Sequence, residues 1–316
     1  MDRNAVIIVT GAAGFIGSCL TGYLNRKGYF NIIIVDDFND LSKKHNYDEK
    51  KICARVDKEE LFDWLNRYKI RIDFVFHLGA YVHSGRQSAS LEKINNDYSK
   101  EIWNYCTDKK VPLIYASFES RQSKNDGKEM QGQFDEWVIK QYNEKNLCPP
   151  FWAGLNLSQV YGPNEYHKGG SASLVFRFFE QMNREGKVIV QKLTNDQSTS
   201  GEQNSDFVYV KDVVDVCYWM MQKSVDETDG PGSGFYDVGS GFTHSQVEIA
   251  GEVFKNSGKE PVIEYVVDTA ANSDTDFIRV ADISKLREAG YKKEFYSLAE
   301  GVKTYVTHFL AGNKYY

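Results

Sequence analysis

A glycine-rich turn between an apolar run and a helical pattern limits the possible folds of this chain more than any other feature. The segment AVIIVTGAAGFIGSCL spaces Gly11, Gly14 and Gly17 three residues apart, after the apolar run at residues 6–9. Such a run is typical of a buried parallel strand, and the apolar residues that follow have helical spacing. Glycines in this context let a dinucleotide pyrophosphate approach the N–H groups at a helix N-terminus. A tight turn in an unrelated α/β protein is the alternative.

The second predicted strand ends in acidic residues, which favours dinucleotide binding over that alternative. The segment NIIIVDDF ends in Asp36 and Asp37, whose carboxylates can accept hydrogen bonds from a ribose hydroxyl. Two carboxylates would repel a 2′-phosphate, whereas Lys43 and Lys44 follow closely enough to reach one. The sequence therefore predicts NADP or NAD as the cofactor and leaves the choice open.

Strand and helix patterns alternate along the chain. RIDFVFHLGA, VPLIYAS and FWAGLNLSQVYGP read as strands, with amphipathic helical patterns between them. This order predicts an α/β fold with a Rossmann-type doubly wound parallel sheet. We expect residues 1–163 to form most of the dinucleotide-binding domain and residues 164–316 a smaller α/β substrate lobe. Segments near residues 207–240 should return to the Rossmann domain, with GFYDVGSG as a strand and Asp212 as a helix N-cap.

Composition excludes several classes of protein. The formal net charge of −6 and the lack of a basic run argue against nucleic-acid binding. The five cysteines include no CxxC pair, so we expect reduced residues and neither a disulfide framework nor a metal site. No apolar run approaches about 18 residues, and the first strand begins almost at once. We therefore expect a cytoplasmic protein without a membrane partner.

Motifs over nearly the whole chain resemble one known family. They are VTGAAGFIGS, FVFHLGA, NNDYSKEIW, LIYAS, FDEW, VYGPNEYHKG, DFVYVKDVVDV and LAEGVKTYV. The chain resembles the ADP-glycero-manno-heptose 6-epimerases, extended short-chain dehydrogenase/reductases of lipopolysaccharide precursor synthesis. The resemblance implies a homo-oligomer that acts on a nucleotide sugar. It also implies that NADP or NAD oxidises carbon 6 of the heptose and that the hydride returns to the opposite face of the ketone.

The resemblance also implies a set of site residues. Family members use a tyrosine four residues before a lysine as acid/base, because a nearby ammonium lowers the tyrosine pKa toward the working range. A serine after the preceding strand holds the oxygen, and a second lysine lies in the HKG segment. The catalytic candidates are Ser117 and Lys168. The expected cofactor site comprises Gly11, Gly14, Phe15, Ile16, Gly17, Asp36, Asp37, Lys43, Asp57, Leu78, Gly79, Ala80 and Asn95.

Each of the two catalytic candidates also has a structural interpretation. Ser117 could hold a ligand hydroxyl or cap the next turn, and the sequence does not separate these roles. For Lys168 we favour a solvated loop lysine, because its tyrosine partner is missing.

The segment that should carry the tyrosine and the first lysine departs from the family pattern. Counted back from FDEW, the lysine position holds Gln131 and the tyrosine position holds Gly127. Phe118 replaces the family's second serine, and the segment is shorter than the family pattern. We expect residues 119–132 to form a re-routed polar loop that presents no side chain to the nicotinamide. Other tyrosines four residues before a lysine are chance matches: Tyr23, Tyr47 and Tyr105.

Further positions in the expected pocket also differ. Tyr81 and His83 are bulky where the family has small polar residues, and Ser205 replaces an arginine that should face the substrate diphosphate. Thr275 replaces a substrate-facing tyrosine. His83 could act as a substitute acid/base because its pKa lies near neutrality, but we favour a polar residue in the pocket wall.

These departures favour a nicotinamide-dinucleotide-binding pseudoenzyme whose epimerase chemistry is lost or strongly reduced. Their distribution fits either a divergent paralogue or a re-engineered pocket. One alternative is an active epimerase, dehydratase or dehydrogenase that has recruited groups such as His83, Tyr81 or Lys168. Another is a non-enzymatic protein that senses the cofactor or binds a partner.

Overall fold

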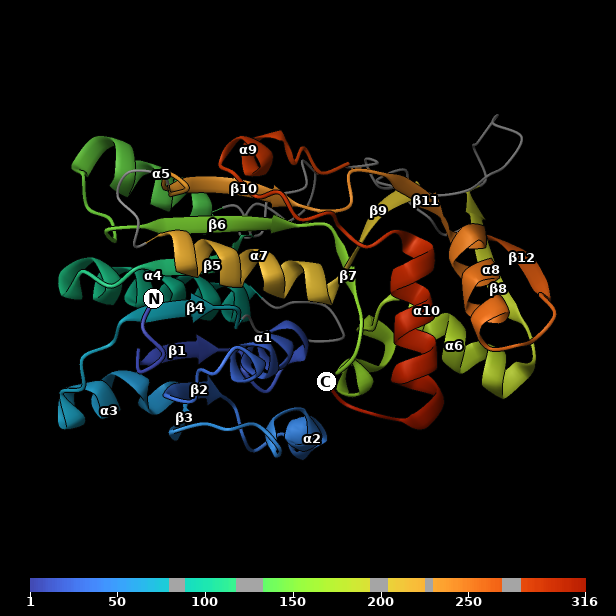
Figure 1. The fold of residues 1–316 in the computed structure, drawn as a ribbon, viewed down its shortest axis with the longest axis horizontal. Helices are drawn as coiled ribbons and strands as arrows, with labels where there is room; N and C mark the ends of the chain where they lie inside the picture. The colour runs from blue at the N-terminus through green and yellow to red at the C-terminus, as the bar shows by residue number, and fades with distance from the viewer. Residues whose placement is uncertain (80–88, 118–132, 194–203, 225–229, 269–279) are drawn as a thin grey trace. The chain divides into compact units, whose positions relative to one another are not determined.

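The chain divides into two compact units, each formed by segments that are distant in sequence. The computed structural model describes residues 1–79, 89–117, 133–193, 204–224, 230–268 and 280–316 (Figure 1). The first unit contains Met1–Asn156, Val214–Tyr236 and Ser284–Lys292, and the second contains Leu157–Val213, Asp237–Ile283 and Lys293–Tyr316. The boundary expected at residue 163 stays a prediction. None of the helices in the described ranges combines the length and apolarity that crossing a membrane requires.

A seven-stranded sheet forms the centre of the first unit. Its order is β10-β6-β5-β4-β1-β2-β3, and the neighbouring strands from β6 to β3 pair in parallel. The sheet is built from apolar runs, which suit strands that are buried on both faces. The strands are β1 (Ile7–Thr10), β2 (Ile32–Asp36), β3 (Ala54–Asp57), β4 (Phe74–His77), β5 (Leu113–Ser117), β6 (Trp152–Leu157) and β10 (Gly234–Val238).

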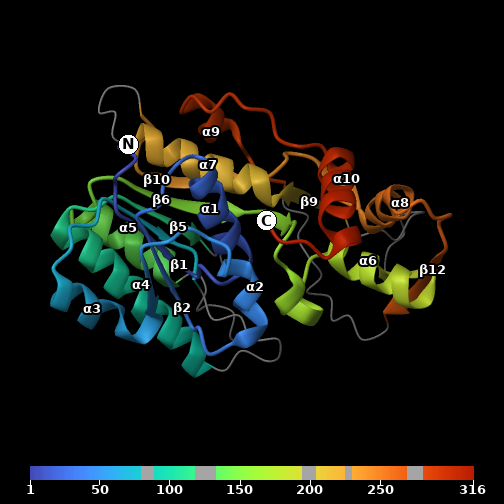
Figure 2. The ribbon, with the colours of Figure 1, turned by 60° about the horizontal axis from the view of Figure 1, so that its bottom comes forward.

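Helices cover both faces of this sheet (Figure 2). One face packs on α3 (Leu61–Tyr68), α4 (Ala89–Lys109) and α5 (Gln133–Lys145), whose buried residues include Leu65, Trp103 and Val138. On the other face, rings of α1 (Phe15–Arg26) and α7 (Val210–Lys223) meet. Short helices complete the unit: η1 (Leu41–Lys43), α2 (Lys44–Tyr47), η2 (Lys58–Glu60) and α9 (Ser284–Glu288). The predicted Rossmann-type doubly wound parallel sheet is therefore confirmed.

The second unit contains two small sheets and three longer helices. In one sheet, β9 (Asn204–Tyr209) pairs in parallel with β7 (Gln159–Tyr161) and antiparallel with β11 (Thr243–Ser245). In the other, β8 (Val188–Leu193) and β12 (Ile263–Asp268) are parallel. The helices are α6 (Leu174–Glu185), α8 (Gln246–Asn256) and α10 (Leu298–His308), with η4 (Tyr166–Ser171) and η5 (Leu310–Gly312).

Helix starts in the second unit follow local capping rules, with one correction to the sequence analysis. Ser245 and Ser297 begin α8 and α10 with capping boxes, in which Glu248 and Glu300 bond back to the N-cap backbone. The expectation that Asp212 is an N-cap is wrong. Helix α7 already begins at Val210, so Asp212 lies in its first turn. Its carboxylate instead accepts the Tyr296 N–H at 2.9 Å.

Candidate functional site: the glycine turn and its supports

The glycine turn lies between β1 and α1 in the first unit and leaves the start of the helix open. Gly11 has a φ of +67°, a conformation that favours glycine. Gly14 is the N-cap of α1 with φ −76° and ψ −173°, and no side chain caps the helix. The first turn of α1 contains no acidic residue. The N–H groups of this turn and the positive end of the helix dipole therefore suit an anionic group.

Two glycines of the turn are required by the packing of the protein itself. A Cβ on Gly17 would lie 2.2 Å from the Gly11 carbonyl oxygen. A Cβ on Gly11 would lie 2.6 Å from the Gly79 Cα, after β4. Within the described part of the chain, a Cβ on Gly14 would meet the Gly11 oxygen alone, at 3.1 Å. Close packing of protein atoms therefore explains Gly11 and Gly17, but it explains Gly14 much less.

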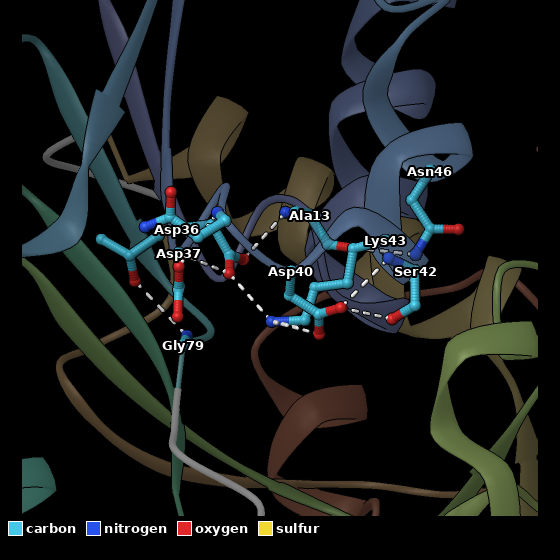
Figure 3. A network of polar contacts seen from close by, with 10 residues as sticks. Ala13, Asp36, Asp37, Asp40, Ser42, Lys43, Asn46 and Gly79 are labelled. Atoms are coloured by element: carbon cyan, nitrogen blue, oxygen red, sulfur yellow. Dashed lines mark hydrogen bonds and ion pairs between the residues drawn. The ribbon is translucent and has the colours of Figure 1, made fainter.

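The peptide groups of Ala13 are held from both sides (Figure 3). The Ala13 N–H donates to Asp36 Oδ2 at 2.9 Å, and Asn46 Nδ2 donates to the Ala13 carbonyl at 2.8 Å. Both side chains are buried, Asp36 at the end of β2 and Asn46 in α2. Because buried backbone groups are costly to leave unpaired, these two bonds fix the turn immediately before Gly14.

Asp36 is the centre of a larger polar network at this edge of the sheet. Its Oδ1 accepts the Asp37 N–H at 2.8 Å and lies 3.1 Å from Lys43 Nζ. Lys43 also lies 3.9 Å from Asp40 Oδ2 (Figure 3). Asp57 is the register partner of Asp36 on β3, and its carboxylate caps η2 by accepting the Glu59 N–H at 3.0 Å.

A buried histidine supports the turn from the strand side. The Gly79 N–H donates to Thr10 Oγ1 at 3.3 Å, and Thr10 Oγ1 lies 2.7 Å from His77 Nδ1. His77 Nε2 lies 2.9 Å from the Ser99 hydroxyl of α4. Burial lowers the pKa of His77 to about 4, so the imidazole is neutral at neutral pH. The Gly79 N–H can only donate, so Thr10 Oγ1 accepts it and joins the glycine turn to His77.

At the end of β5, Ser117 is bonded within the protein. Its hydroxyl donates to Asp135 Oδ2 at 2.5 Å, and the Tyr115 hydroxyl donates to Asp135 Oδ1 at 2.9 Å. All three residues are buried, and burial raises the pKa of Asp135 against the effect of these two bonds. Asp135 lies in the first turn of α5. The serine's only proton is therefore used to hold β5 to α5.

Lys168 lies in η4 of the second unit, next to a buried carboxylate. Its ammonium is 3.8 Å from Glu165 Oε2, and its side chain is 26% exposed. The side chain of Lys168 is thus partly buried beside a carboxyl group, and the choice between a catalytic and a solvated loop lysine stays a prediction. Ser205 lies on β9, opposite His244 of β11.

The structure brings most of the predicted cofactor residues together. Gly11, Gly14, Gly17, Asp36 and Gly79 meet around the turn, with Lys43 bound to Asp36. The Leu78 N–H donates to the Thr10 carbonyl at 3.3 Å. Phe15 is buried in α1, whereas Ile16, Asp37 and Asn95 are partly buried.

Some predicted site residues lie outside the described part of the chain. They are Ala80, Tyr81, His83, Phe118, Gly127, Gln131 and Thr275, together with the loop expected at residues 119–132.

The sequence analysis missed the residues that hold the site residues in place. These are Asn46, His77, Asp135 and Glu165. His77, Asp135 and Glu165 stand inside the quoted motifs FVFHLGA, FDEW and VYGPNEYHKG, but the motifs do not say which partner each side chain holds.

Comparison with known proteins agrees with this geometry. The model of the NAD dependent epimerase/dehydratase family matches residues 7–126 and 133–239. An ADP-L-glycero-D-manno-heptose-6-epimerase of Fusobacterium nucleatum is 35% identical over 336 residues, covering 97% of this chain and 98% of that protein. That alignment is longer than the 316 residues of this chain, so the relative has residues that this chain lacks.

Solved structures of related enzymes share the fold. The ADP-L-glycero-D-manno-heptose-6-epimerase of Helicobacter pylori superimposes with a TM-score of 0.75 at 22% identity, covering 97% of both chains. The UDP-glucose 4-epimerase of Thermotoga maritima, solved with UDP-glucose, gives a TM-score of 0.74 at 24% identity. It covers 98% of this chain and 99% of that one. The resemblance to heptose epimerases found in the sequence is confirmed by the curated relative.

Proposed function

Because this chain belongs to the NAD dependent epimerase/dehydratase family, we propose that it binds NAD at the glycine turn after β1. The observation that carries this proposal is Gly14. Its backbone angles suit any residue, and among the residues that the structure describes a Cβ there would meet one atom within 4 Å, the Gly11 carbonyl oxygen at 3.1 Å. A glycine that protein packing does not require fits a turn against which a pyrophosphate lies.

The charges around β2 favour NAD over NADP. Asp36 and Asp37 place two carboxylates where a ribose would lie, and they would repel a 2′-phosphate. Of the two lysines that could offset them, Lys43 is paired with Asp36 and Asp40, and Lys44 Nζ lies 3.9 Å from Asp48 Oδ2. Asp36 accepts hydrogen bonds from Ala13, Asp37 and Lys43, which leaves capacity on a carboxylate for a ribose hydroxyl. The bound cofactor would supply hydride chemistry, and these residues would bind and orient it.

For the second ligand we propose an ADP-heptose-type nucleotide sugar, with Lys168 contributing positive charge. The support is the 35% identity with a heptose epimerase over nearly the whole chain.

We further propose that epimerisation of this ligand is absent or strongly reduced. The family model leaves residues 127–132 unmatched, and these are the positions where the tyrosine and lysine should stand. Gly127 and Gln131 can neither accept nor return a proton there.

Two measurements test the proposal separately. Titration of tryptophan fluorescence with NAD and NADP should give saturable binding, tighter for NAD. Failure of both to bind at millimolar concentration would refute the cofactor assignment. Incubation with NAD and ADP-heptose, followed by NMR, should show no change in epimer ratio beyond that in a protein-free control.

An active enzyme with recruited groups is the second candidate. The observation in its favour is the retained Lys168, half-buried and held beside Glu165. Lys168→Ala distinguishes the two candidates. If the chain epimerises ADP-heptose and this variant abolishes turnover while nucleotide-sugar binding persists, the recruited-group candidate is correct.

A further inference from the structure

The loop that carries Lys168 is closed from inside by one buried carboxylate. Glu165 Oε1 accepts the Gly162 N–H at 3.0 Å and lies 2.8 Å from the Ser173 hydroxyl. Its Oε2 accepts the Ser173 N–H at 2.6 Å and faces Lys168 Nζ at 3.8 Å. Burial raises the pKa of Glu165, and the charge of Lys168 and these donors oppose that effect. The carboxylate thus joins both ends of residues 162–173.

The same loop is held from outside by residues 314–316. The Tyr166 hydroxyl lies 3.2 Å from the Lys314 carbonyl, and its ring centroid is 4.8 Å from that of Tyr315. The Tyr316 N–H donates to Asn164 Oδ1 at 2.8 Å, and Asn164 is buried. Figure 1 shows the C mark beside the loop that follows β7. Three consecutive residues therefore contact the loop just before Lys168.

An aromatic cluster fixes this segment in turn. The Lys211 ammonium lies 5.6 Å from the ring centroids of Tyr209 and Phe309 and 5.7 Å from that of Tyr316. Such distances are typical of cation–π contacts. The Tyr166 hydroxyl also lies 3.4 Å from the Phe309 carbonyl. Tyr316 is therefore anchored to Lys211 at the start of α7 and to Phe309 after α10, with ring centroids 6.1 Å apart for the second pair.

The part of the loop beyond Lys168 is weakly packed by comparison. A Cβ on Gly169 or Gly170 would meet nothing within 4 Å. Two local hydrogen bonds lie there, from Ser171 Oγ to the Lys168 carbonyl at 2.8 Å and from the Ala172 N–H to the Gly169 carbonyl at 3.1 Å. On the other side, the Lys168 N–H donates to the Glu165 carbonyl at 2.9 Å, which joins Lys168 directly to the anchored residues 164–166.

We propose that Lys314–Tyr316 is a positioning element for Lys168, acting through Asn164 and Tyr166. With the segment in place, the ammonium stays beside Glu165, where it can meet the diphosphate of a nucleotide sugar. This role rests on the nucleotide-sugar site proposed above. Removal of the segment should loosen the loop and weaken binding of the nucleotide sugar, while the glycine turn of the first unit keeps its affinity for NAD.

Truncation after Asn313 tests this inference in the otherwise intact chain. We expect faster amide hydrogen exchange confined to residues 162–173 and a dissociation constant for ADP-heptose about tenfold higher, as loss of one or two hydrogen bonds predicts. The dissociation constant for NAD should stay within about twofold. Tyr315→Ala should reproduce part of the effect and Tyr315→Phe should restore binding, because the phenyl ring can still contact Tyr166. Tyr265→Ala on β12 is the matched control.

Two results would overturn the inference. One is a truncated protein with unchanged exchange in residues 162–173, and the other is faster exchange throughout the second unit, which would indicate a general role in stability. If the full-length chain fails to bind ADP-heptose, the proposed function is wrong, yet the exchange measurement still decides whether the segment positions the loop.

Discussion

At the scale of single residues, the three glycines of the turn serve different needs. Gly17 cannot carry a Cβ, since the atom would lie 2.2 Å from a backbone oxygen. Gly14 has more room, with its one neighbour at 3.1 Å. The glycine spacing alone could not separate these roles, because all three positions look equivalent in sequence. The structure separates Gly17, which the packing of the turn requires, from Gly14, which packing explains less and which we propose a ligand requires.

The Gly14→Val variant should fold but fail to bind NAD, because the side chain would occupy the place of the pyrophosphate. We expect a loss of at least about 100-fold in affinity, or about 2.7 kcal/mol. The comparison variant, Gly17→Ala, should instead lower the thermal midpoint, because its Cβ clashes within the turn. Fluorescence titration and thermal circular dichroism measure the two effects. Wild-type affinity in Gly14→Val would remove the main support for the proposed cofactor site.

His77 should make the fold sensitive to acid. Burial lowers the pKa of His77 to about 4 in the folded state, whereas an unfolded histidine titrates near 6.5. Between these two pKa values only the unfolded chain binds the proton. The free energy of unfolding therefore falls by about 1.4 kcal/mol for each pH unit by which the pH is lowered. Stability from this group is complete above about pH 6.5, and about 3 kcal/mol is lost by pH 4.

Comparison with His77→Gln tests that expectation, since glutamine can bond Thr10 and Ser99 but does not titrate. Urea unfolding at pH 7 and pH 5 gives the free energies of unfolding. From pH 7 to pH 5, the free energy of unfolding should fall by about 2 kcal/mol more in the wild type than in the variant. Equal losses in both proteins would mean that His77 is not kept neutral by the fold.

At the scale of elements, the sequence predicts those whose burial gives a clear pattern. The predicted strands at β1, β2, β4 and β5 are apolar runs that are almost fully buried. The analysis missed β3 because only Val56 of its four residues is buried. It also missed β12, where Tyr265 and Val266 are about half exposed. A strand at the edge of a small sheet has no alternation strong enough to be read.

The site residues that follow a local sequence pattern can be predicted, whereas those that act through distant contacts cannot. The glycines and Asp36 obey a local spacing rule, so the sequence reveals them. Asn46 acts on Ala13, 33 residues earlier, and Asp135 acts on Ser117, 18 residues earlier. FDEW draws attention to Asp135, but the local sequence does not identify the partner of either residue, because these contacts exist only once the fold brings the segments together.

Helix α2 should contribute to cofactor affinity through Asn46. Asn46→Ala leaves the buried Ala13 carbonyl without the amide that holds it, which typically costs about 1–3 kcal/mol. If about half of this free energy is lost from the turn conformation that binds NAD, we expect the dissociation constant for NAD to rise about tenfold. The neighbouring Lys44→Ala, at an exposed side chain, is the control. Calorimetric titration with equal affinities in Asn46→Ala and wild type would contradict this role.

At the scale of the whole molecule, the shared fold is shown, whereas the loss of epimerase chemistry is a proposal. A heptose epimerase aligns with 97% of the chain, and a solved one shares its fold. The family model does not match residues 127–132. The alignment with the heptose epimerase spans 336 residues, so that relative has residues that this chain lacks. A shared fold does not imply a shared reaction, because chemistry depends on a few positioned groups. The fold and the glycine turn are retained, and the departures fall at the acid/base positions.

Restoring those groups by substitution should therefore fail to restore epimerisation. The triple variant Phe118→Ser, Gly127→Tyr and Gln131→Lys supplies the side chains of the family pattern. It does not supply the residues that the relatives have and this chain lacks. General acid–base catalysis contributes about 10²–10⁴-fold only when the group lies within about 3 Å of the sugar oxygen. The variant should bind NAD like the wild type and leave the ADP-heptose epimer ratio unchanged by NMR. Turnover of order 1 s⁻¹, ordinary for an enzyme, would show that these three substitutions alone had removed the activity.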